Sequence, residues 1–101
     1  NIRLKVLGEE HHSTAESCQS IGDINVSLKD WKSALHFYQL ALDIRVKAFG
    51  EKHLITADSH RSIGETHFAL KDLTSALQSF QRESNIRLKV LGEEHPSIAN
   101  S

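Results

Sequence analysis

The opening segment of the chain returns almost letter for letter at its end. The sequence NIRLKVLGEEHHSTAES begins at Asn1, and NIRLKVLGEEHPSIANS begins 84 residues later at Asn85. A weaker copy, DIRVKAFGEKHLITADS, begins halfway between them at Asp43, so the period is 42 residues. Self-similarity at a period of this size predicts a solenoid of stacked supersecondary units, none of which buries its apolar face alone. Because both ends carry the same part of a repeat and the chain has no methionine, we expect a piece of a longer array.

The charge balance argues against two classes of partner. The 12 lysines and arginines and the 13 aspartates and glutamates nearly cancel, which favours neither nucleic acid nor an anionic membrane. The longest apolar runs are far shorter than the roughly 20 residues that cross a bilayer, and nothing resembles a signal peptide. The single cysteine, Cys18, cannot form an internal disulfide and has no basic residue at helical spacing to activate its thiolate. A lone free cysteine is consistent with a reducing compartment, so we expect a cytoplasmic protein.

Apolar residues follow the i, i+3, i+4, i+7 spacing of one helical face in two long stretches. The first stretch consists of Trp31, Ala34, Leu35, Tyr38, Ala41, Leu42 and Val46. The second, which Glu83 interrupts, consists of Leu73, Ala76, Leu77, Phe80, Ser84 and Leu88. A shorter helix precedes each, with stripes formed by Cys18, Ile21, Gly22, Asn25 and Leu28 and by His60, Ile63, Gly64, His67 and Leu70. The Lys29-Asp30 and Lys71-Asp72 connections are short, so each pair of helices is predicted to form an antiparallel hairpin.

Glycine adopts the left-handed conformation that follows many helices, so the long helices are predicted to end at Gly8, Gly50 and Gly92. The predicted helices are 12–28, 31–49, 54–70 and 73–91, with a helix tail at 1–7 and a first turn at 96–101 that begins with Pro96. The chain then divides into two whole repeats, at 11–52 and 53–94. The tail of a preceding repeat lies at 1–10, and the start of a following repeat lies at 95–101. No period-two alternation competes with this pattern. The predicted fold is all-α, a helix-hairpin solenoid.

Residue size identifies the kind of solenoid better than the period does, since HEAT and armadillo repeats have similar lengths. A glycine follows an isoleucine in each short helix, and an alanine precedes a large aromatic in each long one: Ile21-Gly22, Ile63-Gly64, Ala34 with Tyr38, and Ala76 with Phe80. This order of small and large residues resembles the tetratricopeptide repeat. The joining segment IR(L/V)K(V/A)(L/F)GE(E/K)H looks most like the 42-residue version found in kinesin light chains. The resemblance covers essentially the whole chain and implies a right-handed superhelix of about two full repeats with partial flanking helices.

The chain departs from the pattern of the family it resembles in a few places. Asn25 and His67 stand where the family usually has a tyrosine, and Glu83 stands where it usually has an alanine. An acidic side chain at a close helix contact costs stability unless it reaches solvent. We therefore expect the second hairpin to pack less tightly on its next neighbour in the array.

The 7 histidines are not predicted to form a metal or catalytic site. His11, His53 and His95 recur at one position of the repeat, just before each short helix, which favours a structural role. His60 and His67 lie two turns apart on the packing stripe, and the stripe residues between them do not ligate metal. We expect both to be semi-buried packing residues with lowered pKa values. The sequence predicts no catalytic residue, no cofactor and no metal site.

The resemblance implies that the short helices line a concave groove that holds a peptide. On that face we predict six partner-binding residues: Gln19, Asp23, Val26, Arg61, Glu65 and Phe68. Val26 and Phe68 occupy the same place one repeat apart, and apolar anchors within a polar rim are typical of a peptide-binding face. A solvated helix face with a stray phenylalanine explains the pattern equally well. The Lys and Asn clamp with which some family members hold a carboxylate is replaced here by Asp23 and Glu65, so a partner bearing Lys or Arg suits this face better.

We therefore expect a non-enzymatic interaction scaffold that presents this groove to a peptide or protein. The alternative is a structural spacer, or a module that self-assembles by head-to-tail stacking or helix exchange. Solenoids normally close their ends with polar capping repeats. Here Ile2, Val6 and Leu7 at one end and the faces of the helix at 73–91 at the other are expected to leave apolar surface exposed.

Overall fold

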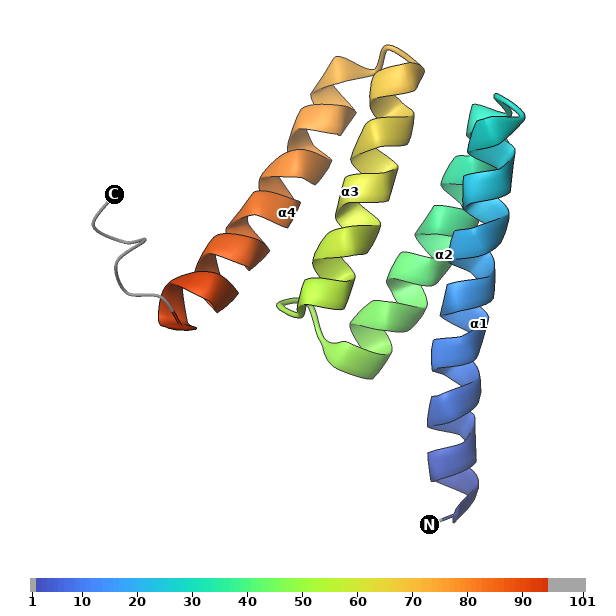
Figure 1. Ribbon diagram of the computed structural model, residues 1–101, viewed down its shortest axis with the longest axis vertical. Helices are drawn as coiled ribbons and strands as arrows, with labels where there is room; N and C mark the ends of the chain where they lie inside the picture. Colours follow the sequence, from blue (N-terminus) through green and yellow to red (C-terminus); the bar gives the residue numbers. More distant parts are fainter. Residues whose placement is uncertain (1, 95–101) are drawn as a thin grey trace.

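Four helices in succession make up the fold. The computed structural model describes residues 2–94 and, among these, the side chains of residues 12–92. The helices are α1 (Ile2–Ser27), α2 (Trp31–Phe49), α3 (Leu54–Ala69) and α4 (Leu73–Glu94), and no strand occurs in the described chain. Each helix packs on the next one, so α2 lies between α1 and α3, and α3 lies between α2 and α4 (Figure 1). The all-α repeat fold with two helix hairpins, α1–α2 and α3–α4, is confirmed.

Two glycines allow the helices of each hairpin to approach closely. A Cβ atom added to Gly22 would lie 2.5 Å from Cε1 of Tyr38, and one added to Gly64 would lie 2.8 Å from Cε1 of Phe80. Both distances are shorter than any van der Waals contact, so the aromatic ring occupies the space that a side chain would need. The pairing of small and large residues therefore repeats in space as it does in the sequence.

The core lies between the first hairpin and α3. One cluster consists of Ala34, Tyr38, Leu42 and Ile63, with Val26, Leu35 and Val46 packed against it. A second cluster joins α1 to α2 through Ala15, Cys18 and Ala41, with Phe37 and Ile44 at its edge. The predicted packing stripe of α2 is confirmed, although Trp31 at its start is only half-buried.

The two hairpin turns are built alike. Lys29 and Lys71 adopt the left-handed conformation, with φ of 62° and 67°. The aspartate that follows each lysine accepts a hydrogen bond from a backbone N–H three residues later. Asp30 accepts from the N–H of Ser33 at 3.3 Å, and Asp72 accepts from the N–H of Ser75 at 3.2 Å. A side-chain acceptor at this position satisfies one of the free donors of a helix N-terminus, so each aspartate starts the second helix of its hairpin.

Only one of the three predicted glycine terminators ends a helix. Gly50, with φ of 94°, ends α2, and its N–H donates to the carbonyl oxygen of Val46 at 2.8 Å. α1 runs without a break through Gly8, and α4 continues past Gly92 to Glu94, so those two predictions are wrong. Glycine permits a turn but does not impose one, and inside a helix it costs only about 1 kcal/mol. At Gly50 the chain must reverse so that α3 can pack on α2.

Several predicted stripe residues are exposed. They are Ile21 and Leu28 of α1, Leu70 at the end of α3, and Leu73, Leu77 and Leu88 of α4. Within the described residues, α1 packs mainly on α2 and α4 mainly on α3, so part of each apolar stripe is uncovered. This exposure of α4 is what we expected for the final long helix. The described part of the chain does not include residue 1 or residues 95–101, among them His95 and Pro96. It also does not include the side chains of Ile2, Val6, Leu7 and His11.

Candidate functional site

The six predicted binding residues lie on two helices, α1 and α3. Gln19, Asp23 and Val26 belong to α1, and Arg61, Glu65 and Phe68 belong to α3. A hydrogen bond from Nε2 of Gln19 to Oγ of Ser62, 2.9 Å long, joins the two helices directly. We call the surface that α1 and α3 form the α1–α3 side.

Three of the six residues line one hollow between α1, α2 and α3. This hollow has a volume of about 260 Å³ and is lined by Asp23, Val26, Trp31, Tyr38, Ser62, Glu65 and Thr66. The hydroxyl of Tyr38 donates to the carboxylate of Asp23, and burial, followed by this hydrogen bond, raises the pKa of Tyr38. The hollow therefore combines two carboxylates, Asp23 and Glu65, with the apolar walls of Val26 and Trp31.

Phe68 faces a different hollow. It lines a hollow of about 290 Å³ together with Glu65 and Phe80 of α4. Glu65 lines both hollows, so the two are adjacent along α3. Phe68 is an exposed side chain. The structure therefore separates the two apolar anchors that the repeat pattern had paired, because each belongs to its own hairpin.

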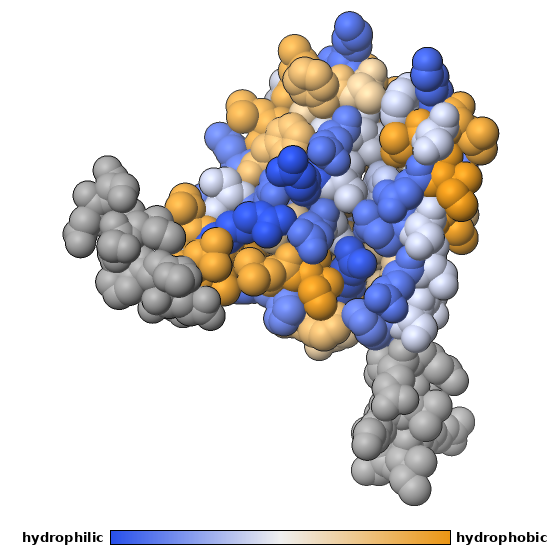
Figure 2. Space-filling model, in the orientation of Figure 1, coloured by the Kyte–Doolittle hydropathy of each residue, from blue (hydrophilic) through white to orange (hydrophobic). Residues whose placement is uncertain are grey.

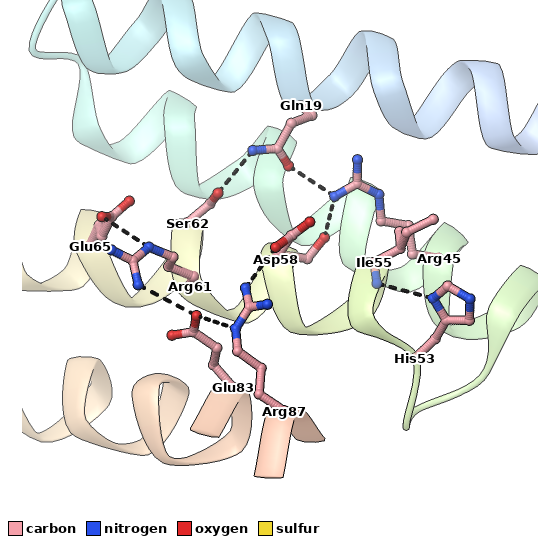
Figure 3. Close-up of polar contacts among 11 residues, drawn as sticks. Gln19, Arg45, His53, Ile55, Asp58, Arg61, Ser62, Glu65, Glu83 and Arg87 are labelled. Atoms are coloured by element: carbon pink, nitrogen blue, oxygen red, sulfur yellow. Dashed lines mark hydrogen bonds and ion pairs between the residues drawn. The ribbon is translucent and has the colours of Figure 1, made fainter. Parts of the chain in front are cut away.

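Arg61 belongs to an ion-pair network around a buried carboxylate. Glu83 is only 7% exposed. Its Oε2 lies 2.8 Å from Nε of Arg87 and 3.5 Å from Nη1 of Arg61 (Figure 3). Arg87 also lies 2.7 Å from Asp58, and Arg61 lies 3.6 Å from Glu65. The hydrogen bonds to Asp58 and Glu83 raise the pKa of Arg87.

This network shows how the charge of Glu83 is accommodated. The side chain does not reach solvent, yet two arginines compensate its charge, so it joins α4 to α3. The looser packing expected on the next unit of the array concerns residues outside the described part. The sequence did contain a signal, because Arg87 follows Glu83 at the i, i+4 spacing that places side chains together on a helix.

A buried cation, Arg45, was not predicted from the sequence. It is 8% exposed, and its Nη1 donates to Oγ of Ser59 at 2.8 Å and to Oε1 of Gln19 at 3.3 Å (Figure 3). These contacts join all three helices around α2, because Gln19 belongs to α1 and Ser59 to α3. Gln19 is therefore also a structural residue. The signal was the recurrence of arginine at Arg45 and Arg87, one period apart.

The family model for the tetratricopeptide repeat matches residues 20–89. The chain belongs to the tetratricopeptide repeat family. Repeats of this family generally mediate protein–protein interaction and are typically non-catalytic scaffolds. No curated protein and no solved structure matches the chain significantly. In the described residues, none of the helices is long and apolar enough to cross a membrane.

Three described histidines of this tetratricopeptide array, His53, His60 and His67, fill structural positions. Nδ1 of His53 accepts a hydrogen bond from the N–H of Ile55 at 3.0 Å, which starts α3. His60 is buried, and its burial, with Arg82 nearby, lowers its pKa, as expected. His67 is half-buried, and its Nδ1 lies 3.8 Å from Oδ2 of Asp72. Among the described side chains, no group of three or more His, Cys, Asp or Glu residues is placed to hold a metal ion.

A larger hollow of the array is lined by other residues. It has a volume of about 720 Å³ and is lined by residues of α2, α3 and α4 and the α2–α3 turn: Leu42, Asp43, Val46, Lys47, Glu51, His60, Arg82, Asn85 and Ile86. Acidic and basic side chains both line it, so its charge does not select a ligand of either sign. Its size exceeds that of the hollow beside Asp23, but it contains none of the predicted binding residues.

Proposed function

We propose that the chain is a protein–protein interaction scaffold that binds a peptide segment on its α1–α3 side. The observation that carries this proposal is the hollow at which Asp23, Val26 and Glu65 meet between α1, α2 and α3. We assign it to the 42-residue type of repeat found in kinesin light chains, with whole repeats at 11–52 and 53–94, and to the cytoplasm. In this assignment α1 and α3 are the groove-lining helices.

The chemistry of the hollow favours a cationic side chain beside an apolar one. Asp23 and Glu65 are both exposed and line the same hollow, and the nearest cation to Glu65 is Arg61 at 3.6 Å. A lysine or arginine of the partner can lie between the two carboxylates, and charge complementarity of this kind gives specificity and speeds association. A neighbouring leucine or phenylalanine can contact Val26, Trp31 or, in the adjacent hollow, Phe68.

A peptide array tests this proposal. Peptides that place Lys or Arg at varied spacings from Leu or Phe are screened against the 101-residue chain, and bound sequences are titrated in solution. We expect binding that requires the cation, weakens with salt because charges at an exposed site are screened, and falls about tenfold for the variant Glu65→Gln.

Glu51→Gln is the matched control, because Glu51 is an exposed glutamate that lines the large hollow instead. Its affinity should equal that of the natural sequence. A chain that binds none of the peptides, or binds them equally well after Glu65→Gln, would contradict the proposal and favour a spacer role.

A further inference from the structure

The contact between α3 and the first hairpin is the template with which two other surfaces of the molecule are compared. α3 docks on the first hairpin through Ile63, which is 5% exposed and clusters with Ala34, Tyr38 and Leu42 of α2. Val26, Leu35 and Val46 surround this cluster and are partly buried by it. Apolar area removed from water in this way is the main stabilising term of such an interface.

The second hairpin presents the same surface without a cover. One period after Val26, Leu35 and Val46 stand Phe68, Leu77 and Leu88, which are 62%, 58% and 57% exposed. Phe80 takes the place of Tyr38 and lines the 290 Å³ hollow beside Phe68. We call Phe68, Leu77, Phe80 and Leu88 the acceptor face. Only Leu42 lacks an apolar counterpart, since Ser84 occupies that position.

The first helix carries the matching surface, also without a cover. Ile21 occupies the position of Ile63, one period earlier, but is 40% exposed. Ile24 occupies the position of Thr66, which is 2% exposed, and is itself 59% exposed. Ser17 and Ser20 occupy the positions of Ser59 and Ser62, and both are exposed. We call these four residues of α1 the donor ridge.

We propose that the donor ridge of one molecule docks on the acceptor face of a second copy, as α3 docks on the first hairpin. Ile21 corresponds to Ile63, the apolar residue that α3 contributes to the internal contact. The acceptor face corresponds to most of the apolar residues of the first hairpin that pack against Ile63. The polar positions also correspond: Arg45 and Gln19 donate to Ser59 and Ser62 in the template. Arg87 and Arg61 occupy their positions on the second hairpin, opposite Ser17 and Ser20 of the docking copy.

The two surfaces lie at opposite ends of the molecule, so the contact repeats. Apolar surface is visible along the upper part of α1 at the right of the space-filling view and over the α3–α4 hairpin at the left, with hydrophilic surface between them (Figure 2). A contact that uses different surfaces on its two sides is head-to-tail and adds further copies until it closes into a ring. The association does not use the hollow beside Asp23, but its acceptor face shares Phe68 with the adjacent hollow.

Sedimentation of the 101-residue chain across a wide range of concentration tests the proposal. The weight-average mass should rise above the monomer mass of 11.3 kDa and should not stop at a dimer. The variants Ile24→Glu, in the donor ridge, and Leu77→Glu, in the acceptor face, should each weaken association about tenfold or more, because each buries a charge in an apolar contact. Leu40→Glu is the control: Leu40 is an exposed leucine of α2 outside both surfaces, and this variant should associate normally.

Mixing the two variants makes the test specific for a head-to-tail contact. Ile24→Glu keeps an intact acceptor face and Leu77→Glu keeps an intact donor ridge, so the mixture should form a one-to-one dimer and grow no further. Circular dichroism before mixing establishes that each variant is folded. A natural chain that stays monomeric at every concentration overturns the proposal, and so does a mixture of folded variants that forms no dimer.

Discussion

Single side chains show which parts of the repeat pattern translate directly into contacts. Gly22 and Gly64 belong to the order of small and large residues that recurs in the sequence, and each lies against the aromatic ring of its own hairpin. Such a pairing is local, because both partners belong to one repeat, and therefore the sequence predicts it well. Trp31 belongs to the predicted packing stripe of α2, yet it is only half-buried, because the extent of its burial depends on how neighbouring helices cover it.

His60 gives a prediction at the same scale. Its folded pKa is lowered, so the unfolded chain takes up a proton first as pH falls. The stability that neutral His60 provides is fully present above the unfolded pKa of about 6.5 and is lost as pH falls through that value toward the folded one. We expect the urea midpoint of the natural chain to fall between about pH 7 and pH 5, and His60→Gln to reduce this fall. The control His36→Gln changes an exposed histidine and should keep the natural slope. An unchanged slope in His60→Gln would contradict the assignment.

At the scale of helices, the contact between α3 and α4 includes an ion-pair network that the repeat pattern does not indicate. The repeat pattern places a small residue at position 83, as Ala41 does one period earlier, and Glu83 was predicted to loosen packing on the next unit of the array, not on α3. The compensation comes from Arg87 on the same helix and from Arg61 on α3. The first was within reach of sequence reasoning at i, i+4 spacing. The second requires the angle and register of two packed helices, which no periodicity specifies.

Removal of the Glu83 charge should therefore destabilise the chain. Breaking a buried ion pair by removing one partner leaves a charge uncompensated, which costs about 3–5 kcal/mol when burial is complete. Arg87 is partly exposed and keeps Asp58, so we expect Glu83→Gln to lower the free energy of unfolding by roughly 1–2 kcal/mol. Glu16→Gln, at an exposed pair with His12 in α1, should change it by less than about 0.5 kcal/mol. Denaturant unfolding measures both, and equal stability of the two variants would show that the network contributes little.

For the whole molecule, the helix order predicts an uneven distribution of stability. Within the described chain, α2 and α3 have packed neighbours on both sides, while α1 packs mainly on α2 and α4 mainly on α3 (Figure 1). In repeat proteins each unit contacts only its neighbours, so stability is close to a sum of local and nearest-neighbour terms. A period in the sequence predicts this arrangement of contacts. It does not predict which apolar faces stay uncovered, since that depends on which neighbours are present.

Amide hydrogen exchange can measure this distribution and its link to self-association. In dilute solution the amides of α4 should exchange faster than those of α2 and α3, because regions with fewer buried contacts open more readily. At concentrations where copies stack, a second molecule covers the acceptor face, and binding to the folded state slows its opening. Protection of α4 should therefore rise with concentration in the natural chain and stay constant in Leu77→Glu. If α4 were as protected as α2 in dilute solution, the nearest-neighbour description of this array would be wrong, because an isolated terminal helix would then be as stable as one packed on both sides.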